Sequence, residues 1–387
     1  MFKTALAHSQ PLTINLMTFA VLDHVTLGQL TYYRGRVALY ALLKAMNIGA
    51  GDEVAAQAFT CIAVPEAIMG TGATPLYVDI EPDGFNMSPE NLLRRLTSRT
   101  RAIIVQHTYG IPADMERIIA AADEHGIPVI EDCCHTLLST HRSQLVGKLG
   151  AASFYSFEWG KPLAAGIGGA AIVNDPDLQE KVRLDYAGYR QPSTSSQLRL
   201  ELQYFAFRLL FRPALYWPAR SLYHLMSSAG IAEGSYNPIG EVARDFSLRM
   251  PGKTLRRMKR KLSQLESIGR HSRWVTGLYQ QMIQSDNVSH PRLLSDSDVV
   301  FVRYPILLAD KQSTLEKARR ANIEMADWYS TPVHPLSTPD WHLVNYEAGS
   351  CPNAERRCQE IVTLPTHSSV GTSYITRASR FLNNGTG

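Results

Sequence analysis

Between residues 36 and 174, short apolar stretches rich in β-forming residues alternate with stretches whose apolar residues recur at helical spacing. The alternation predicts helices over 36–46, 62–69 and 113–125, and strands over 53–58, 74–80, 102–107, 128–133, 153–157 and 169–174. Regular alternation with apolar strands is typical of an α/β fold, in which helices cover both faces of a mostly parallel central sheet. In such sheets, ligands bind beyond the carboxyl ends of the strands.

The pattern changes after residue 176. Residues 192–196 (PSTSS) predict a loop, and 198–226 are rich in aromatic and apolar residues. A helical pattern runs through 255–268, followed by a predicted strand over 300–308 and a predicted helix over 313–321. We therefore expect an N-terminal arm over 1–30 and a large domain over 31–250 with a helical insertion at about 191–245. A smaller C-terminal α/β domain is expected over 251–387.

Composition narrows the protein class. The chain has 387 residues and a net charge of +4, too balanced for a dedicated nucleic-acid binder. It has five cysteines without a CxxC motif, which indicates reduced thiols. The N-terminus has no continuous apolar stretch of the signal-peptide kind, and no run reaches about 18 apolar residues. We therefore expect a cytoplasmic protein without a transmembrane helix.

Two residues could carry chemistry at the strand ends. Lys161 follows a predicted strand in the segment SFEWGKPLAAGIGG, whose bulky apolar residues would lower the pKa of its amine and favour Schiff-base formation. Alone, such a lysine is more often a solvated loop residue. Asp132 ends another predicted strand, where its carboxylate would need a cation such as a protonated pyridine nitrogen. A helix cap or a structural ion pair is the alternative for Asp132.

Further candidates surround the same predicted cleft. Gly35 and Arg36 open a predicted helix whose free N–H groups could bind a phosphate, which the Ser156 hydroxyl could also reach. His107 and His135 follow strands that end there, although such histidines are more often structural. Neither HExxH nor a paired His/Cys spacing occurs, so no metal site is expected.

Taken in order, several segments resemble the DegT/DnrJ/EryC1/StrS family, the pyridoxal-phosphate-dependent sugar aminotransferases of fold type I. The resemblance covers about 33–384 through GRVALYALLKAMNIGAGDEV, TGATPLYVDIEPDGFNMSPE, TRAIIVQHTYGIPADM, HGIPVIEDCCHT, SFYSFEWGKPLAAGIGGAAIVND and LPTHSSV. It implies pyridoxal 5'-phosphate as cofactor. It also implies a homodimer or larger oligomer with shared active sites, acting on small molecules rather than on nucleic acid.

The resemblance also implies roles for the cofactor residues. Lys161 matches the lysine that forms the internal aldimine and then acts as general base. Asp132 matches the acid that keeps the pyridine nitrogen protonated, and His135 matches the position beside the 3-hydroxyl. Gly35, Arg36 and Ser156 match the phosphate site, the first two mainly through backbone N–H groups.

The chain departs from the family pattern at two cofactor positions. Cys61 stands where the family usually has an aromatic ring that stacks on the cofactor. Ser247 aligns with an Asn that the neighbouring subunit often supplies to the phosphate. Arg249, two residues further on, is retained and is expected to contact substrate. Trp328 and His334 lie in a segment that resembles one near the bound acceptor, so they are expected to contact substrate.

The basic run over 253–261 is expected on the solvated face of a helix, with a nucleotide diphosphate as the alternative contact. The aromatic and basic stretch over 198–226 could lie on a membrane surface. We instead expect it to pack on its own enzyme or across a dimer, because Pro213 and Pro218 break a long amphipathic helix.

The expected activity is transfer of an amino group from glutamate or glutamine to a keto sugar, expected to be nucleotide-linked. One alternative is an aminotransferase for a cyclitol or another ketone. The other is a regulatory protein that keeps the fold without turnover.

Overall fold

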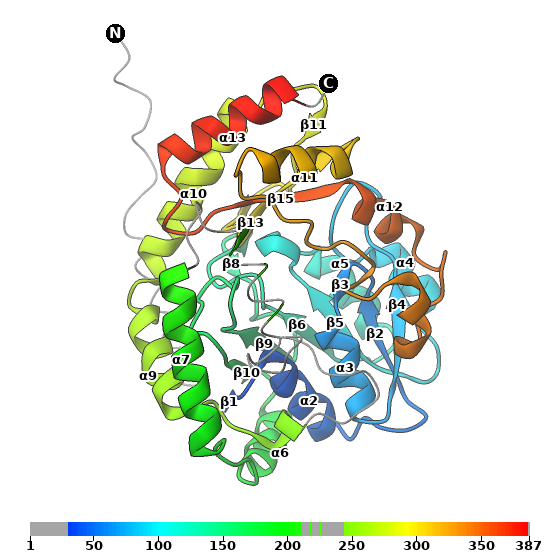
Figure 1. Cartoon of the computed structure of the whole chain (residues 1–387). Helices are drawn as coiled ribbons and strands as arrows, with labels where there is room; N and C mark the ends of the chain where they lie inside the picture. Colours follow the sequence, from blue (N-terminus) through cyan, green and yellow to red (C-terminus); the bar gives the residue numbers. More distant parts are fainter. Residues whose placement is uncertain (1–29, 211–216, 219–220, 222–224, 226–243, 386–387) are drawn as a thin grey trace.

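The computed structural model describes residues 30–385 except 211–216, 219–220, 222–224 and 226–243, and at its centre is a seven-stranded sheet (Figure 1). The strands lie in the order β1 (Thr31–Tyr32), β10 (Gly169–Val173), β9 (Ala152–Ser156), β6 (Val129–Asp132), β5 (Thr100–Gln106), β2 (Glu53–Gln57) and β4 (Thr74–Val78). Neighbouring strands from β9 to β4 are parallel, and β10 is antiparallel to both of its neighbours. This confirms the predicted mostly parallel α/β sheet.

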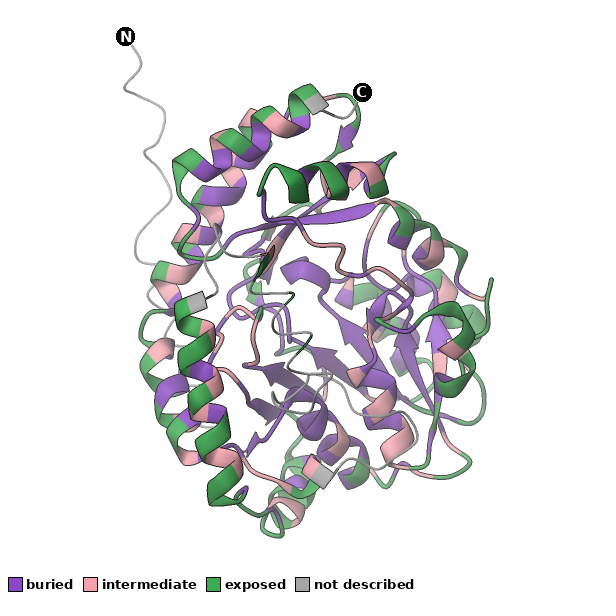
Figure 2. Ribbon diagram, in the orientation of Figure 1, coloured by how far each residue is buried: buried purple, intermediate pink, exposed green. Residues whose placement is uncertain are grey.

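Helices cover both faces of this sheet because its side chains alternate between two apolar cores. Val54 and Ala56 of β2 lie in the core with α2 (Gly35–Ala45), α3 (Ala63–Gly70) and α6 (Pro176–Tyr186). Ala55 lies in the other core, with α4 (Pro89–Arg95) and α5 (Met115–Asp123). The strands are therefore buried on both sides, as Figure 2 shows.

The C-terminal part is built on a three-stranded antiparallel sheet, β11 (Val288–Ser289), β13 (Arg303–Leu308) and β15 (Ile361–Pro365). Its helices are α10 (Leu265–Met282), α11 (Lys311–Arg320), α12 (Pro352–Glu360) and α13 (Thr372–Gly385). A second small sheet joins β12 (Ser297–Asp298) to β7 (Thr140–His141) and β8 (Gln144–Leu145) of the large part. The short 3-10 helices are η1 (Thr108–Gly110), η3 (Arg244–Ser247) and η4 (Thr338–Val344).

The two parts share apolar cores. Strand β14 (Val333–His334) of the C-terminal part pairs in parallel with β3 (Thr60–Cys61) of the large part. Helix α9 (Gly252–Leu262) buries Met258 in one core with Tyr155 of β9. The domain boundary near 250 therefore stays a prediction, because the helix that follows it packs on the large sheet.

Two local expectations were wrong. The loop predicted over 192–196 contains the start of α7 (Thr194–Leu210), because the Ser193 hydroxyl accepts the N–H of Ser196 at 3.2 Å and so caps the helix. The helical pattern over 255–268 is two helices, since α9 ends at Leu262 and α10 begins at Leu265. The predicted N-terminal arm lies outside the described residues, apart from residue 30. Among the described helices, none has the length and apolar character needed to cross a bilayer.

Candidate active site

The candidate site lies where two neighbouring parallel strands and one helix meet. Asp132 ends β6, Ser156 ends β9, and Gly35 is the first residue of α2. A Cβ atom on Gly35 would lie 3.0 Å from Cβ of Ser156 and 3.4 Å from Sγ of Cys134. The absence of a side chain at Gly35 thus brings the N-terminus of α2 against the ends of both strands, as expected for this part of an α/β sheet.

Asp132 is a buried carboxylate that needs a positive partner. Its side chain accepts the N–H of Cys134 at 2.9 Å, and the residue is 4% exposed. Burial raises the pKa of Asp132, while the Cys134 donors and the charge of Lys161 act in the opposite direction. Within the described part of the chain, no cation lies at ion-pair distance from Asp132. Its burial at a strand end fits a group that brings a protonated nitrogen into the site.

Lys161 borders the same space as Asp132 and His135. Its Nζ atom lies 5.0 Å from the centroid of the Trp328 ring, which in turn is 4.6 Å from the His135 ring. Its charge acts on the pKa of Asp132, His135 and Cys61. The fold therefore brings together the residues that the resemblance assigns to the cofactor ring and its aldehyde.

His135 is buried and held in one orientation by two tyrosines. Its Nδ1 accepts the backbone N–H of Tyr109 at 3.1 Å, so the ring proton is assigned to Nε2, which lies 3.3 Å from the Tyr329 hydroxyl. Burial, together with the charge of Lys161, holds the pKa of His135 well below its usual value. The neutral imidazole is therefore an N–H donor beside Lys161.

Sequence reasoning missed Tyr109 and Tyr329 as parts of the site. Tyr329 was within reach, since it follows Trp328 in the segment already assigned to the acceptor. Tyr109 follows His107 closely at the end of a predicted strand, and its hydroxyl hydrogen-bonds to the N–H of Tyr329 at 3.0 Å.

The predicted phosphate site lies at the N-terminus of α2. Helix α2 has no side-chain cap and no acidic residue in its first turn, which suits an anion at its N-terminus. The Arg36 guanidinium is engaged elsewhere, since it donates to Glu66 at 3.1 Å and to Asp245 at 2.9 Å. The guanidinium is therefore not directed to the predicted phosphate, and the predicted contact of Arg36 is through its backbone N–H. The Ser156 hydroxyl lies 3.5 Å from the N–H of Glu158.

A buried ion network links α2 to residues 157–168, the loop between β9 and β10 that carries Lys161 (the lysine loop). Sequence reasoning did not find this network. Arg34 pairs with Glu158 and, at 3.1 Å, with Asp245. Burial acts to lower the pKa of Arg34, but these carboxylates outweigh it and raise that pKa. The carbonyl of Glu158 accepts the N–H of Lys161 at 3.3 Å. The network thus links the start of α2 to the segment that carries Lys161.

The predicted acceptor residues reach the site from the C-terminal part. The pairing of β14 with β3 sets His334 opposite Cys61, which is half-buried. His334 contacts the Ser330 hydroxyl at 2.9 Å through Nδ1, and its ring lies 5.6 Å from that of Tyr329. Trp328 and His334 therefore stand near Lys161 and Cys61, where substrate contact was predicted.

Ser247 and Arg249 are not brought into this group within the chain. Ser247 is exposed, and its carbonyl accepts the N–H of Arg190 at 2.9 Å. Arg249 donates to the carbonyls of Tyr186 and Ala187, near the end of α6, at 2.9 and 3.2 Å. Among the described residues, neither hydrogen-bonds to the predicted cofactor ligands. A phosphate contact through Ser247 and a substrate contact through Arg249 stay predictions.

His107 belongs to a buried structural cluster. Its Nε2 lies 3.0 Å from Glu131, which also accepts the N–H groups of Gly147, Leu149 and Gly150 at 2.7 Å. Ligand atoms of His107, Glu131 and Cys133 lie within 4.8 Å of one another. Because the Glu131 oxygens already accept these bonds, the arrangement favours a structural role for His107, the alternative weighed above.

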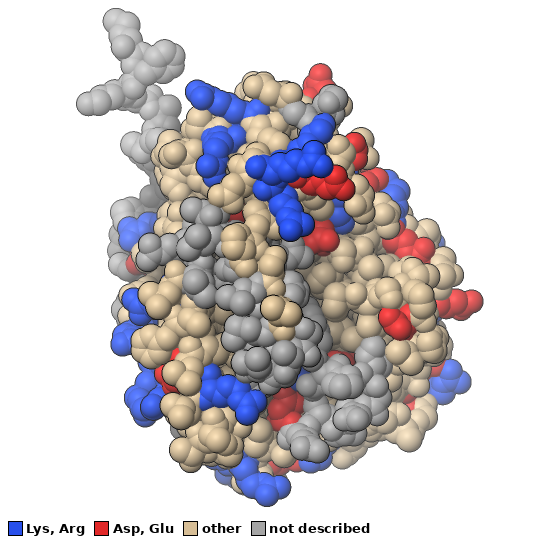
Figure 3. Space-filling model, viewed as in Figure 1, with Lys and Arg blue, Asp and Glu red and all other residues tan. Residues whose placement is uncertain are grey.

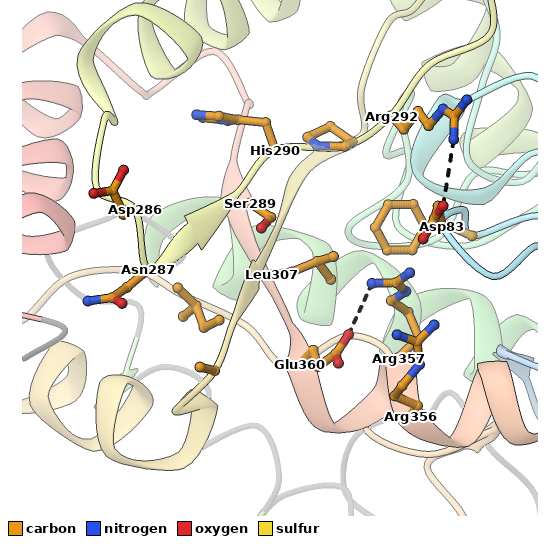
Figure 4. A pocket seen from close by; sticks show the side chains of 14 residues that line it. Asp83, Asp286, Asn287, Ser289, His290, Arg292, Leu307, Arg356, Arg357 and Glu360 are labelled. Carbon is orange, nitrogen blue, oxygen red and sulfur yellow. Dashed lines mark hydrogen bonds and ion pairs between the residues drawn. The ribbon is translucent and has the colours of Figure 1, made fainter.

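A separate pocket of about 500 Å³ lies in the C-terminal part, beside β13 and α12 (Figure 4). Four of its charged residues form two ion pairs: Arg292 lies 3.6 Å from Asp83, and Arg357 lies 3.0 Å from Glu360. None of the predicted site residues lines this pocket. The pocket is therefore separate from the residues that are predicted to carry the chemistry.

Comparison with known proteins finds relatives of two kinds. A "Pleiotropic regulatory protein" from Geobacillus stearothermophilus is 30% identical over 333 residues, covering 86% of this chain and 77% of that protein. A UDP-N-acetyl-3-dehydro-alpha-D-glucosamine 3-aminotransferase from Acidithiobacillus ferrooxidans is 43% identical over 150 residues, 38% of this chain and 41% of that protein. An L-glutamine:2-deoxy-scyllo-inosose aminotransferase from Streptomyces fradiae is 37% identical over 148 residues, covering 38% of this chain and 35% of that protein. The matches to both aminotransferases span less than half of their length.

Solved aminotransferase structures share the fold. The aminotransferase TlmJ from Streptoalloteichus hindustanus superposes with a TM-score of 0.73 at 20% identity, over 96% of this chain and 90% of that one. The putative sugar aminotransferase Spr1654 from Streptococcus pneumoniae, in a PLP form, superposes with a TM-score of 0.74 at 17% identity. The superposition covers 99% of this chain and 93% of that one. Since the family model for DegT/DnrJ/EryC1/StrS aminotransferases matches residues 29–381, the chain belongs to this family of pyridoxal-phosphate-dependent aminotransferases.

Proposed function

We propose that this chain transfers an amino group from glutamate or glutamine to the keto group of a nucleotide-linked sugar. The observation that carries the proposal is the meeting of Lys161 with the buried Asp132 at the carboxyl ends of β6 and β9. A reactive amine beside an acid that needs a positive partner suits pyridoxal phosphate. The activity named for the Acidithiobacillus relative supports a nucleotide-linked acceptor.

The residues present fit this cofactor. The uncapped N-terminus of α2 and the Ser156 hydroxyl would hold its phosphate, and Asp132 would hold its ring nitrogen. Lys161 would hold it at the aldehyde, and His135 would donate from Nε2 beside the ring. When bound, pyridoxal phosphate supplies an electron sink that stabilises negative charge on the substrate carbon.

The side chains of this protein would then transfer protons and restrict the access of water. As a free amine, the Nζ atom of Lys161 would accept a proton from the carbon of the amino donor, and in the second half-reaction it would deliver a proton to the carbon of the acceptor. Its position 5.0 Å from the Trp328 ring centroid is within the range of a cation–π contact, which would help to orient the side chain. Trp328 and the buried Tyr329 also limit the access of water to this side of Lys161.

The test of this proposal locates the reactive lysine. The wild-type protein is incubated with pyridoxal phosphate, reduced with borohydride and digested, and mass spectrometry then identifies the modified residue. We expect modification of Lys161 and a visible absorbance band that is absent from Lys161→Ala. Lys148→Ala, which removes an exposed lysine, serves as the control and keeps the band. A band that survives in Lys161→Ala would contradict the proposal.

A cyclitol is the second candidate acceptor, favoured by the scyllo-inosose aminotransferases among the relatives. Both acceptor classes would have to fit against the wall formed by Trp328 and His334. Turnover measured with matched panels of nucleotide-linked keto sugars, free keto sugars and inososes separates them. A rate with inososes that exceeds every nucleotide-linked rate would replace the first acceptor with the second.

The regulatory alternative is suggested by the Geobacillus relative, which is named "Pleiotropic regulatory protein" and aligns over most of this chain. A single-turnover experiment distinguishes it from an enzyme. Loss of the visible band on adding glutamate or glutamine to the loaded protein, with release of the matching oxo acid, supports catalysis and identifies the donor. A spectrum unchanged by either donor favours the regulatory alternative. The homodimer and the cytoplasmic location stay predictions.

A further inference from the structure

Helix α7 is apolar on two opposite sides, and one of them anchors it to the chain. Leu200 and Tyr204 are buried. Trp159, from the lysine loop, stacks on Phe207 and on Tyr204, with ring centroids 4.1 and 5.3 Å apart. This side packs on the enzyme, as predicted for the start of the insertion.

The opposite side of α7 carries large apolar residues that stay in solvent. Leu198, Leu202, Phe205 and Leu209 are 60, 63, 59 and 66% exposed. At about 100° per residue they fall within an arc of about 60°, so they form one stripe along the helix. We call these four residues the apolar stripe. A contiguous row of exposed apolar side chains indicates an interaction surface.

Cationic residues border the apolar stripe. Arg199 and Arg208 are exposed on α7, and at helical spacing they fall on either side of the stripe. Helix α9 lies beside α7 (Figure 1), joined to it by an ion pair between Arg257 and Glu201 at 2.6 Å. The exposed cations of α9 are Lys253, Arg256, Lys259 and Arg260. Figure 3 shows Lys and Arg side chains along this side of the molecule.

Acidic residues are nearly absent from this surface. Helix α9 contains none, and the one acid of α7, Glu201, is engaged by Arg257. If two copies met through this surface around a two-fold axis, their cations would face each other and repel. A negatively charged apolar partner suits it better, and an anionic bilayer is both.

Helix α7 is not interrupted by the prolines that disfavour a long amphipathic helix over 198–226. It ends at Leu210, before Pro213 and Pro218. The 17 residues of α7 form about four and a half turns without a proline. The helix is thus long enough to lie along a bilayer surface, and no described helix is suited to cross it.

We propose that the apolar stripe of α7 and the exposed cations of α9 form a surface that binds reversibly to anionic lipid bilayers. The four apolar side chains would enter the interface, while Arg199, Arg208 and the α9 cations would contact lipid phosphates. The proposal does not depend on the reaction catalysed.

The test uses the full-length protein and sedimentation with sucrose-loaded vesicles. We expect binding to vesicles of phosphatidylcholine with 30% phosphatidylglycerol, much weaker binding to phosphatidylcholine alone, and a fall in binding as salt is raised. Leu202→Gln with Phe205→Gln should lower the partition coefficient roughly tenfold or more. Lys259→Gln with Arg260→Gln should lower it several-fold and weaken its salt dependence.

Leu93→Gln on α4 is the matched control, since Leu93 is 45% exposed and lies on a different helix. It should bind vesicles as the wild type does. Absence of binding to anionic vesicles, or equal loss with Leu93→Gln, would overturn the proposal. Sedimentation equilibrium tests whether a second copy of this chain, and not a bilayer, covers the apolar stripe. If Leu202→Gln with Phe205→Gln splits an oligomer into smaller units, the apolar stripe is a subunit contact and not a lipid surface.

Discussion

Gly35 lies at a crowded position of the candidate site, where a side chain has no room. An added Cβ would meet Cβ of Ser156 at 3.0 Å and the Tyr155 carbonyl at 3.3 Å. Gly35 is also the first residue of α2, whose N-terminus is the predicted phosphate site. The position therefore joins two requirements, close packing of α2 on β9 and access of an anion to the helix N-terminus.

We predict that Gly35→Ala lowers the free energy of unfolding by about 1–3 kcal/mol, because the methyl group overpacks the contact with Ser156. Retention of pyridoxal phosphate should fall as well, measured as cofactor release during gel filtration. Gly277→Ala is the control, because no atom lies within 4 Å of its Cβ position in α10. That change should be neutral or stabilise by up to about 1 kcal/mol. Equal behaviour of the two variants would contradict the crowding seen at Gly35.

Glu131 allows a prediction about pH. Burial acts to raise the pKa of Glu131, but His107 and the backbone N–H groups outweigh it and hold that pKa below the ordinary value of 4.5. The ionised carboxylate therefore contributes stability that is complete above about pH 4.5 and is lost as the pH falls through the folded-state pKa.

Glu131→Gln should lower the free energy of unfolding by about 3 kcal/mol at pH 7, because an amide group replaces an acceptor that faces four donors. Urea titrations from pH 7 down to pH 3 should show this difference shrinking. Glu180→Gln removes an exposed acid paired with Arg183 and should leave the free energy of unfolding almost unchanged at every pH. A difference for Glu131→Gln that grows toward acid pH would refute the prediction.

Single residues could be assigned from sequence where chemistry and local position coincide. Asp132 and Lys161 stood out because each follows an apolar strand that ends in the predicted cleft. The segment of Tyr329 was assigned, but its contact with His135, 194 residues away, is set by tertiary packing. The same applies to Arg34, whose partners Glu158 and Asp245 are set by tertiary packing and not by spacing.

At the scale of elements, α9 shows why a charge pattern is only a partial guide. The basic run was expected on a solvated face, but Arg257 is buried, so this expectation was wrong for that residue. Its guanidinium donates to the Ala165 carbonyl at 2.8 Å and lies 3.5 Å from the centroid of the Tyr204 ring. Charge alone could not separate it from its neighbours, because the burying surface belongs to α7 and to the lysine loop.

We predict that Arg257→Lys lowers the free energy of unfolding by about 1–2 kcal/mol, because an ammonium group cannot both stack on Tyr204 and bond in two directions. Arg256→Lys is the control one residue earlier, where the side chain is exposed, and should have almost no effect. Urea midpoints of the two variants provide the comparison. Identical midpoints would show that Arg257 does not join α9 to α7.

Element length limited which strands could be predicted, although β15, with five residues, was also missed. The strands β2, β5, β9 and β10 have five or more residues, and each was predicted to within two residues at either end. The two-residue strands β1, β3 and β14 are too short to carry a repeating pattern. Yet β3 and β14 bring His334 beside Cys61, so one wall of the candidate site rests on elements that the pattern could not reveal.

At the scale of the whole molecule, the alternation of strands and helices was enough to predict the architecture, because a parallel sheet needs helices on both faces. The division at residue 250 was harder to test, since the parts on either side share apolar cores. Phe59 and Tyr109 of the large part lie in one core with Tyr304 and Tyr329 of the C-terminal part. The two parts are therefore coupled through the residues that surround the candidate site.

The strand pair β3–β14 has a consequence for how the site can be made. A polypeptide that ended at residue 250 would contain Lys161, Asp132 and the α2 N-terminus, yet it would lack Trp328, Tyr329 and His334. During synthesis on the ribosome, the amine would thus gain its aromatic covering only after most of the chain had emerged. Productive binding of cofactor and substrate would consequently be among the last events of maturation.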